Sequence, residues 1–458
     1  MKLKLPHTLS IIFSLIIIMA VLTWVLPAGQ FDRIHNEAIG RDVVVPGTYK
    51  EVPSNPQGFL DTFSSFARGI VNAAEVIAYV LIIGGAYGVI LKTGAINNGL
   101  KAAVKKLEGR EFLLIPVLMF LFSIGGTMAG MYEETLAFYL ILIPLMVRAG
   151  YDPIVGVATI LLGVGAGLTA SIGNPFATGI ASHIAEIPIT DGILSRVIFY
   201  FICLGTSIAY VLWYANRIKK NPKKSICYAN RAEHQESFAN LTNEEGHIRF
   251  GLNQKLIIII FLGLIFFMMY AVVQLGWWIP EMTVLFLAGA MVAAILGGLN
   301  EKEFWDSFVE GSKDLLYAAI VVGLTRAIVI VAQDGAIIDT ILHGIVSVLS
   351  GLSQNLFIML NQIFQLFIAF LVPSSSGHAA LTMPLMAPLA DLFSVPRSSV
   401  VTAYQTASGL INQFAPTAAV VMAAIGMAKI SYFHWLKFVM PLLFVQLIIA
   451  LVVLVFTL

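Results

Sequence analysis

Long apolar runs recur along the whole sequence, each near the roughly 20 residues that an α-helix needs to cross a bilayer. They lie near 10–27, 70–92, 153–187, 192–215, 256–275, 280–298, 315–333, 398–428 and 432–457. Two further apolar stretches, 111–149 and 354–395, have polar middles. With 58% hydrophobic and 12% charged residues, the pattern predicts an all-α polytopic membrane protein.

One short motif occurs in both halves, each time inside an apolar run. Asn-Pro-Phe-Ala-Thr at 174–178 is echoed by Asn-Gln-Phe-Ala-Pro-Thr at 412–417. Three further motifs match in the same order, all at separations of 238 to 242 residues, beginning at Phe63 and Trp305, Gly94 and Gly335, and Pro144 and Pro384. The matches predict a duplication, with a first inverted repeat over 1–215, a cytoplasmic linker and connecting helix over 216–279, and a second inverted repeat over 280–458.

Lysine and arginine predict the orientation of the halves. The segments 92–110 and 216–255 are rich in both residues and are expected in the cytoplasm. The second-half equivalent of the first segment, 334–354, has neither residue and is expected outside. Equivalent segments on opposite sides predict inverted topology, with the N-terminus cytoplasmic and the C-terminus outside. The run 10–27 is interpreted as a retained helix rather than a signal peptide.

Irregular backbone at membrane depth is tolerated only beside protein or a wet cavity. The stretches 111–149 and 354–395 are therefore predicted as re-entrant hairpins, although two full spans each would fit the charges equally. The runs 153–187 and 398–428 are predicted as broken helices, and paired breaks point to the central site of a secondary transporter. The segments 59–69 and 301–314 are predicted as amphipathic interfacial helices.

The first hairpin carries two carboxylates in its middle, Glu133 and Glu134, followed by Thr135. Ionisable groups within a membrane are costly and mark function. The alternative is that one glutamate caps the following helix and pairs with a buried cation. Arg326, inside an apolar run, is expected to pair with Glu133 or Glu134, or with a substrate carboxylate. Glu75 is interpreted as an interfacial residue.

The second hairpin carries the serines Ser374, Ser375 and Ser376, followed by His378. Hydroxyls and free backbone N–H groups at a helix start can hold a carboxylate. The serines are also expected to cap the helix that begins near Ala379. His378 is either a ligand-binding residue or a buried, hydrogen-bonded core residue.

The two broken helices offer Asn174 and Thr178 in one half and Asn412 and Thr417 in the other. Helix breaks expose carbonyls that can coordinate sodium and amides that can hold a carboxylate. We therefore predict substrate contacts at these residues and a Na+ site near Asn174 and Asn412. The alternative is that the neighbouring prolines only kink the helices.

An acidic tip and a hydroxyl-rich tip together suit a small zwitterion, which favours an amino acid, and a cationic one in particular. The sequence has no phosphate-binding glycine loop and no basic stripe, so we expect neither direct ATP hydrolysis nor a nucleic-acid partner. The expected partners are a small-molecule substrate and membrane lipid. No cofactor is expected beyond Na+ or H+ as the coupling ion.

Several motifs resemble the YfcC-type branch of the C4-dicarboxylate anaerobic carrier (DcuC-like) family, within the wider ion-transporter superfamily. The matching motifs are Pro6-His7-Thr8, Leu26-Pro27-Ala28-Gly29-Gln30-Phe31, Glu133-Glu134-Thr135-Leu136-Ala137-Phe138-Tyr139, Ser374-Ser375-Ser376-Gly377-His378-Ala379 through Pro388-Leu389-Ala390-Asp391, and Ala415-Pro416-Thr417. The resemblance implies an inner-membrane secondary carrier, commonly a homodimer, with hairpin tips at the substrate site and elevator-like movement.

The resemblance leaves the substrate open, because the branch is associated with basic amino-acid antiport and the family name with C4-dicarboxylates. Glu-Glu-Thr at the first tip replaces the Ser-Asn-Thr of dicarboxylate–sodium carriers and favours an amino acid. Two other classes of membrane protein are alternatives. An intramembrane serine hydrolase would use Ser375 or Ser376 with His378, and a channel would not need two occluding hairpins.

Overall fold

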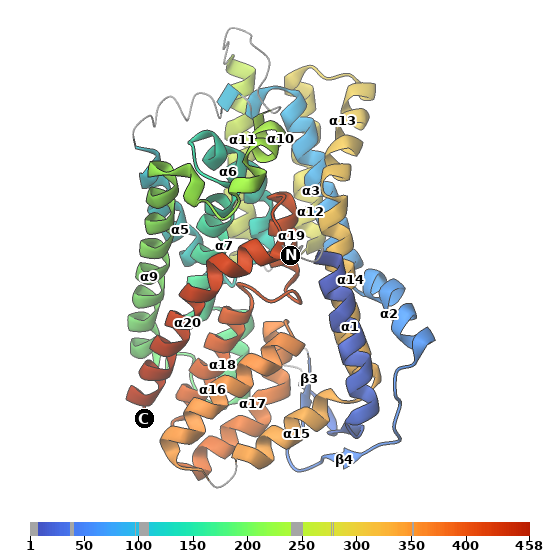
Figure 1. Cartoon of the computed structure of the whole chain (residues 1–458), viewed down its shortest axis with the longest axis vertical. Coiled ribbons are helices and arrows are strands. Elements are labelled where there is room, and N and C mark those ends of the chain that lie inside the picture. Colours follow the sequence, from blue (N-terminus) through green and yellow to red (C-terminus); the bar gives the residue numbers. More distant parts are fainter. Residues whose placement is uncertain are drawn as a thin grey trace.

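The computed structural model is mostly α-helical, and in its described residues the strands are short and form no closed sheet. The structure describes residues 8–36, 41–96, 98–99, 110–239, 251–275, 277, 279–349 and 352–458. Most helices lie roughly along the long axis of the molecule (Figure 1). The predicted helical class is confirmed, whereas the re-entrant and inverted details stay predictions.

Two pairs of helices have equal lengths in the two halves. α2 (Phe59–Asn72) and α13 (Glu301–Asp314) have 14 residues each, and α3 (Ala74–Lys92) and α14 (Leu316–Asp334) have 19 each. The pairs pack across the halves, because α2 contacts α14 and α13 contacts α3. In Figure 1, α13 stands alongside α3 instead of lying across it, so protein covers part of its apolar face.

Glycines of the repeated motif allow both cross-half contacts. Gly69 of α2 lies against the carbonyl group of Gly323 on α14, and Gly311 of α13 lies against the carbonyl group of Gly84 on α3. A Cβ atom at Gly69 or Gly311 would collide with this backbone. Close approach through small residues is typical of helix packing in membranes. The same motif therefore makes the same kind of contact in each half.

The first apolar stretch with a polar middle folds as two helices joined by an irregular tip, which we call hairpin 1. α5 (Leu114–Ile124) continues into a π-helical turn and ends at Gly130, whose φ of +68° favours glycine. A short 3₁₀ turn, Glu133–Thr135, then leads into α6 (Leu136–Arg148). Both predicted carboxylates thus lie at the start of the returning helix.

The second such stretch, which we call hairpin 2, comprises α16 (Gln354–Leu371) and α17 (Ser375–Leu392). Its tip is the three residues between them, and Ser374 is the N-cap of α17. The serines therefore begin the helix, which was predicted to start near Ala379. In both hairpins the second arm contains a proline of the repeated motif, Pro144 or Pro384.

Both runs predicted to be broken contain an interruption at the repeated motif. α7 (Pro153–Thr169) is separated from α8 (Ile180–Ile184) by residues that include a π-helical turn, Pro175–Gly179. α18 (Arg397–Ile411) is separated from α19 (Ala419–Met427) by an irregular segment. α7 and α18 pack against each other, so the interruptions of the two halves meet near the centre of the molecule.

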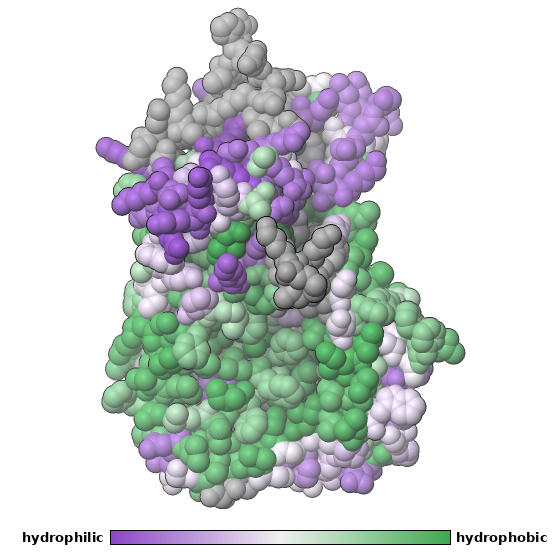
Figure 2. Space-filling model, viewed as in Figure 1, coloured by the Kyte–Doolittle hydropathy of each residue, from purple (hydrophilic) through white to green (hydrophobic). Residues whose placement is uncertain are grey.

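Single helices occupy the remaining predicted spans: α1 (Thr8–Val25), α9 (Ile193–Lys220), α11 (Leu252–Leu275), α12 (Ile279–Gly297) and α20 (Tyr432–Phe456). In the described part of the chain, five helices are long and apolar enough to cross a membrane, namely α3, α9, α12, α16 and α20. Figure 2 shows an apolar belt with hydrophilic side chains gathered mainly at one end of the molecule. These features indicate a multi-pass membrane protein.

Two elements were not predicted. Residues 27–57, which we call the insertion, contain the strand pairs β1–β4 (Gly29–Gln30, Lys50–Glu51) and β2–β3 (Arg33–Asn36, Arg41–Val44). The helix α15 (Ile338–Leu349) follows α14 at a bend of 71°. Both Nη2 hydrogen bonds of Arg33 reach the Asp339 carboxylate, at 2.8 and 2.9 Å, and attach the insertion to α15.

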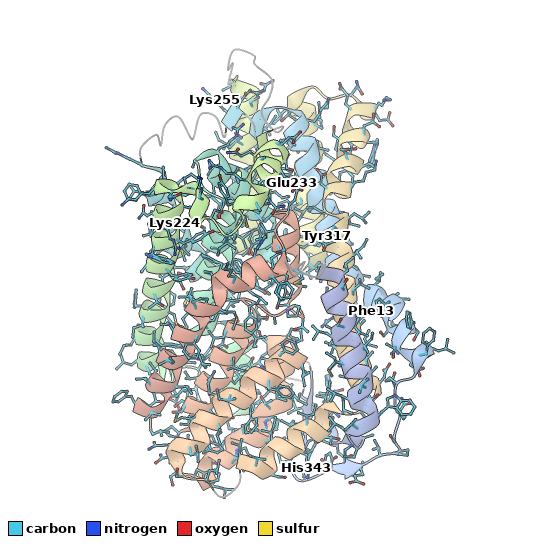
Figure 3. All side chains as sticks on the ribbon, viewed as in Figure 1. Phe13, Lys224, Glu233, Lys255, Tyr317 and His343 are labelled. Atoms are coloured by element: carbon cyan, nitrogen blue, oxygen red, sulfur yellow. The ribbon has the colours of Figure 1, made fainter. Side chains whose placement is uncertain are left out.

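The basic linker lies at the opposite end of the molecule from α15. Lys224, Glu233 and Lys255 are grouped at one end, and His343 of α15 lies at the other (Figure 3). The short helix α10 (Arg231–Ala239) belongs to the linker end (Figure 1). The basic residues Lys2, Lys4, Lys101, Lys105, Lys106 and Arg249, which also supported the orientation, lie outside the described residues.

Candidate functional site

A cavity of about 350 Å³ lies between the two hairpin tips and the two helix breaks. Its volume falls within the roughly 300–1,000 Å³ of small-molecule sites. Nine predicted residues line it, namely Glu133, Glu134, Asn174, Arg326, Ser374, Ser375, Ser376, Asn412 and Thr417. Residues far apart in the sequence and drawn from both halves therefore converge on one space, which we call the central cavity.

The hairpin 1 tip presents its two carboxylates differently. Glu134 is 4% exposed, and its Oε2 accepts a 2.7 Å hydrogen bond from the Tyr132 backbone N–H. Glu133 is half-buried, and its charge interacts with that of Arg326. Within the described residues these two side chains form no direct ion pair. Thr135 is buried outside the cavity and donates its hydroxyl to the Tyr132 carbonyl at 2.6 Å.

The hairpin 2 tip is held by hydroxyl groups. Ser374 Oγ accepts a 3.3 Å hydrogen bond from the Gly377 N–H and caps α17, as the sequence predicted. Ser375 shares a 3.1 Å hydrogen bond with Ser408 on α18. The Ser376 hydroxyl lies 3.4 Å from that of Ser374. The N-terminus of α17 and three hydroxyls thus border the cavity.

His378 does not line the cavity. Its Nε2 hydrogen-bonds Gln365 Oε1 at 2.6 Å, and its ring packs edge-on against Tyr404 at 4.7 Å between centroids. Fully buried, it matches the core-residue alternative. No hydrogen bond joins it to Ser375 or Ser376 in the described structure, so these residues do not form the nucleophile–base pair of a serine hydrolase.

In the first helix break, polar side chains are used mainly for local structure. Asn174 Oδ1 accepts hydrogen bonds from the backbone N–H groups of Phe176 (2.9 Å) and Ala177 (3.3 Å). Thr178 lies outside the cavity, fully buried, with its hydroxyl 2.8 Å from Ser171 Oγ and 3.2 Å from Gln405 Oε1. Asn174 therefore borders the cavity, whereas Thr178 stabilises the wall behind it.

The second helix break connects to both hairpins. The Tyr132 hydroxyl donates to the Asn412 carbonyl at 2.5 Å, and Thr417 donates to the Phe370 carbonyl at 3.0 Å. The Asn412 side-chain amide lines the cavity and makes no hydrogen bond to a described residue. The Asn412 side chain is thus free to meet a ligand, whereas the Asn174 side-chain oxygen is already hydrogen-bonded.

Sequence reasoning missed several residues that line the cavity, chiefly Asn72, Glu75, Tyr132 and Phe176. Tyr132 and Phe176 are next to predicted site residues and could have been included on that ground. Glu75, expected at the membrane interface, is exposed and also lines the cavity. Its placement depends on how α3 packs, and no local signal reports this.

The family model for the C4-dicarboxylate anaerobic carriers, DcuC, matches residues 5–458. A Haemophilus influenzae protein named as uncharacterised is 34% identical over 96% of this chain and 94% of its own length. An Escherichia coli K12 protein named "putative basic amino acid antiporter YfcC" is 33% identical over 94% of this chain and 92% of its own.

Two solved structures align with most of the chain at 15% identity. They are the YdaH transporter of Alcanivorax borkumensis, with a TM-score of 0.40 over 98% of both chains, and Neisseria gonorrhoeae MtrF, titled as illuminating a class of antimetabolite efflux pumps, with a TM-score of 0.42 over 99% of this chain and 95% of its own. Similarity at this level is too weak to support a structural argument. By its family match and its relatives, this chain belongs to the DcuC family of C4-dicarboxylate anaerobic carriers, a family of membrane transporters.

Proposed function

We propose that this protein is a secondary active transporter of a small amino acid, preferably a basic one, which binds in the central cavity. The observation that carries the proposal is the convergence of an acidic tip and a hydroxyl-rich tip on one space. A zwitterion satisfies both, with its ammonium group toward Glu134 and its carboxylate toward Ser374–Ser376 and the N-terminus of α17. The name of the E. coli relative supports the same substrate class.

A C4-dicarboxylate is the second candidate. The family description supports it, and Arg326 offers the cavity a guanidinium group that could hold a carboxylate. The hairpin 1 tip argues against this candidate, because its two carboxylates, Glu133 and Glu134, would repel a dianion. We therefore rank the amino acid first.

The proposed mechanism is elevator-like alternating access, driven by symport with, or exchange against, an ion gradient. Tips and helix breaks of both halves border the central cavity, and such paired elements are suited to movement of a substrate-bearing unit against a fixed one. Na+ near Asn174 and Asn412, or H+ on the tip carboxylates, is the proposed coupling ion. We propose an inner-membrane homodimer whose linker end is cytoplasmic, with the N-terminus on that side and the C-terminus outside.

Radiolabelled uptake into proteoliposomes tests the proposal. Saturable accumulation of arginine or ornithine that collapses when the imposed Na+, H+ or counter-substrate gradient is removed is the expected result. Unlabelled succinate or fumarate should not compete. Competition by dicarboxylates, with none by amino acids, would transfer the assignment to the second candidate.

Glu134→Gln gives the matched variant, because it removes the buried charge while preserving shape. We expect it to abolish uptake or uncouple it from the gradient. The control is Glu310→Gln, on an exposed part of α13 where the side chain is 75% exposed. Wild-type uptake by Glu134→Gln protein would exclude the acidic tip from the mechanism.

A further inference from the structure

Glu75 is the cavity carboxylate that pairs with none of the described residues. It lies in the first turn of α3, lines the central cavity, and makes no hydrogen bond or ion pair with any described residue. The other two cavity carboxylates differ. Glu134 is hydrogen-bonded to the Tyr132 N–H, and the charge of Glu133 is opposed by Arg326.

The Glu75 side chain is exposed, so a ligand in the cavity can reach it. Ile77, in the same part of α3, contacts Gly323 of α14. No described residue places a cation against the Glu75 carboxylate, so a cationic group of a ligand in the cavity could pair with it.

The formal charges of the cavity favour the same conclusion. Three carboxylates, Glu75, Glu133 and Glu134, face a single guanidinium group, that of Arg326. If Arg326 offsets Glu133 and the substrate ammonium offsets Glu134, one negative charge remains at Glu75. A neutral amino acid would leave it uncompensated, whereas a basic amino acid carries a second cation that offsets it.

We propose that Glu75 is a specificity-determining residue that binds the side-chain cation of a basic amino acid. This inference rests on the proposed function and deepens it. Glu75 comes from α3, whereas the tips that would hold the α-ammonium and α-carboxylate groups come from hairpins 1 and 2. The two ends of the substrate would thus be recognised by different parts of the fold, and the distance between them would select for a long cationic side chain.

Competition between arginine and citrulline tests the inference, since citrulline has nearly the same shape and an uncharged side chain. The concentration of each that halves labelled arginine uptake is measured in proteoliposomes. Wild-type protein should prefer arginine, and Glu75→Gln should reduce the arginine-to-citrulline preference about tenfold or more, as loss of a charge-assisted contact implies. Glu310→Gln, the same change on the exposed face of α13, should keep the wild-type ratio.

The outcomes separate the inference from the function on which it rests. An unchanged ratio in Glu75→Gln, with normal arginine uptake by wild-type protein, overturns the role of Glu75 and leaves the transporter assignment intact. No arginine uptake or competition in wild-type protein overturns both. If Glu75→Gln does not fold, Glu75→Asp decides, because its shorter carboxylate should weaken the preference for arginine without removing the charge.

Discussion

The Tyr132 hydroxyl donates a 2.5 Å hydrogen bond to the backbone carbonyl group of Asn412. Tyr132 lies at the tip of hairpin 1, and Asn412 ends α18 in the second half, 280 residues later in the sequence. The bond therefore joins the two halves directly at the cavity wall. The same residue also donates its backbone N–H to Glu134, so one tyrosine links the acidic tip to the opposite helix break.

Tyr132→Phe should remove this connection while keeping the ring. A buried carbonyl would lose its partner at a cost of about 1–3 kcal/mol, and uptake should fall because the two walls of the cavity are no longer held together. Uptake rate and thermal unfolding in detergent provide the measurements. Tyr87→Phe is the control, since the buried Tyr87 hydroxyl has no hydrogen-bond partner among the described residues; equal losses in both variants would contradict the prediction.

Substitutions in the serine tip of hairpin 2 should distinguish helix capping from substrate binding. Ser374 caps α17, so Ser374→Ala should destabilise the protein by about 1 kcal/mol. Ser376 borders the cavity and contacts the Ser374 hydroxyl at 3.4 Å, but caps nothing. We expect Ser376→Ala to raise the KM for uptake with little change in the melting temperature. A drop in melting temperature with unchanged KM would make Ser376 a structural residue instead.

The cross-half helix contacts should depend on glycine. Gly311→Ala places a methyl group against the backbone of Gly84 and should cost about 1–3 kcal/mol through overpacking. Gly205 lies in the middle of α9 on an exposed face, and a Cβ atom there would meet no other atom within 4 Å. Gly205→Ala should therefore stabilise the protein slightly, by roughly 0.5–1 kcal/mol. Thermal unfolding of both variants in one detergent gives the comparison. Equal stability of the two variants would mean that the close contact of α13 with α3 at Gly311 does not contribute to the stability of the protein.

The convergence of the tips and breaks was predictable because the membrane makes local sequence informative. Polar groups inside an apolar run, such as Asn174 and Ser374, must turn toward protein or a wet cavity. Their recurrence in both halves then implied a shared centre, but a local motif does not determine which face each residue presents. His378 and Thr178 show this limit, since both follow site residues closely in sequence and yet lie behind the cavity wall.

The features that sequence reasoning missed depend on long-range contacts. The position of Glu75 follows from the packing of α3 on α14, where Ile77 of α3 lies beside Gly323, more than two hundred residues later in the sequence. α15 has only 12 residues, and its helical spacing of Leu342, Ile345 and Leu349 is too short a pattern to stand out in so apolar a sequence. The strands of the insertion have only two or four residues each, too few for an alternating pattern to be recognised.

The last prediction concerns the attachment of the insertion to α15. Asp339 is 4% exposed and Arg33 is 39% exposed, so solvent screens only one side of their ion pair. Arg33→Gln leaves the Asp339 carboxylate with the Phe31 N–H, at 2.9 Å, as a remaining partner, and should cost about 1–3 kcal/mol. Adding Asp339→Asn should recover part of this loss, because the uncompensated charge is then removed.

Asp42→Asn, in the exposed pair with His35, is the control and should change stability by less than about 1 kcal/mol. Thermal unfolding of the single and double variants forms a double-mutant cycle, and strictly additive losses would mean that the insertion is held by its backbone contacts rather than by this ion pair.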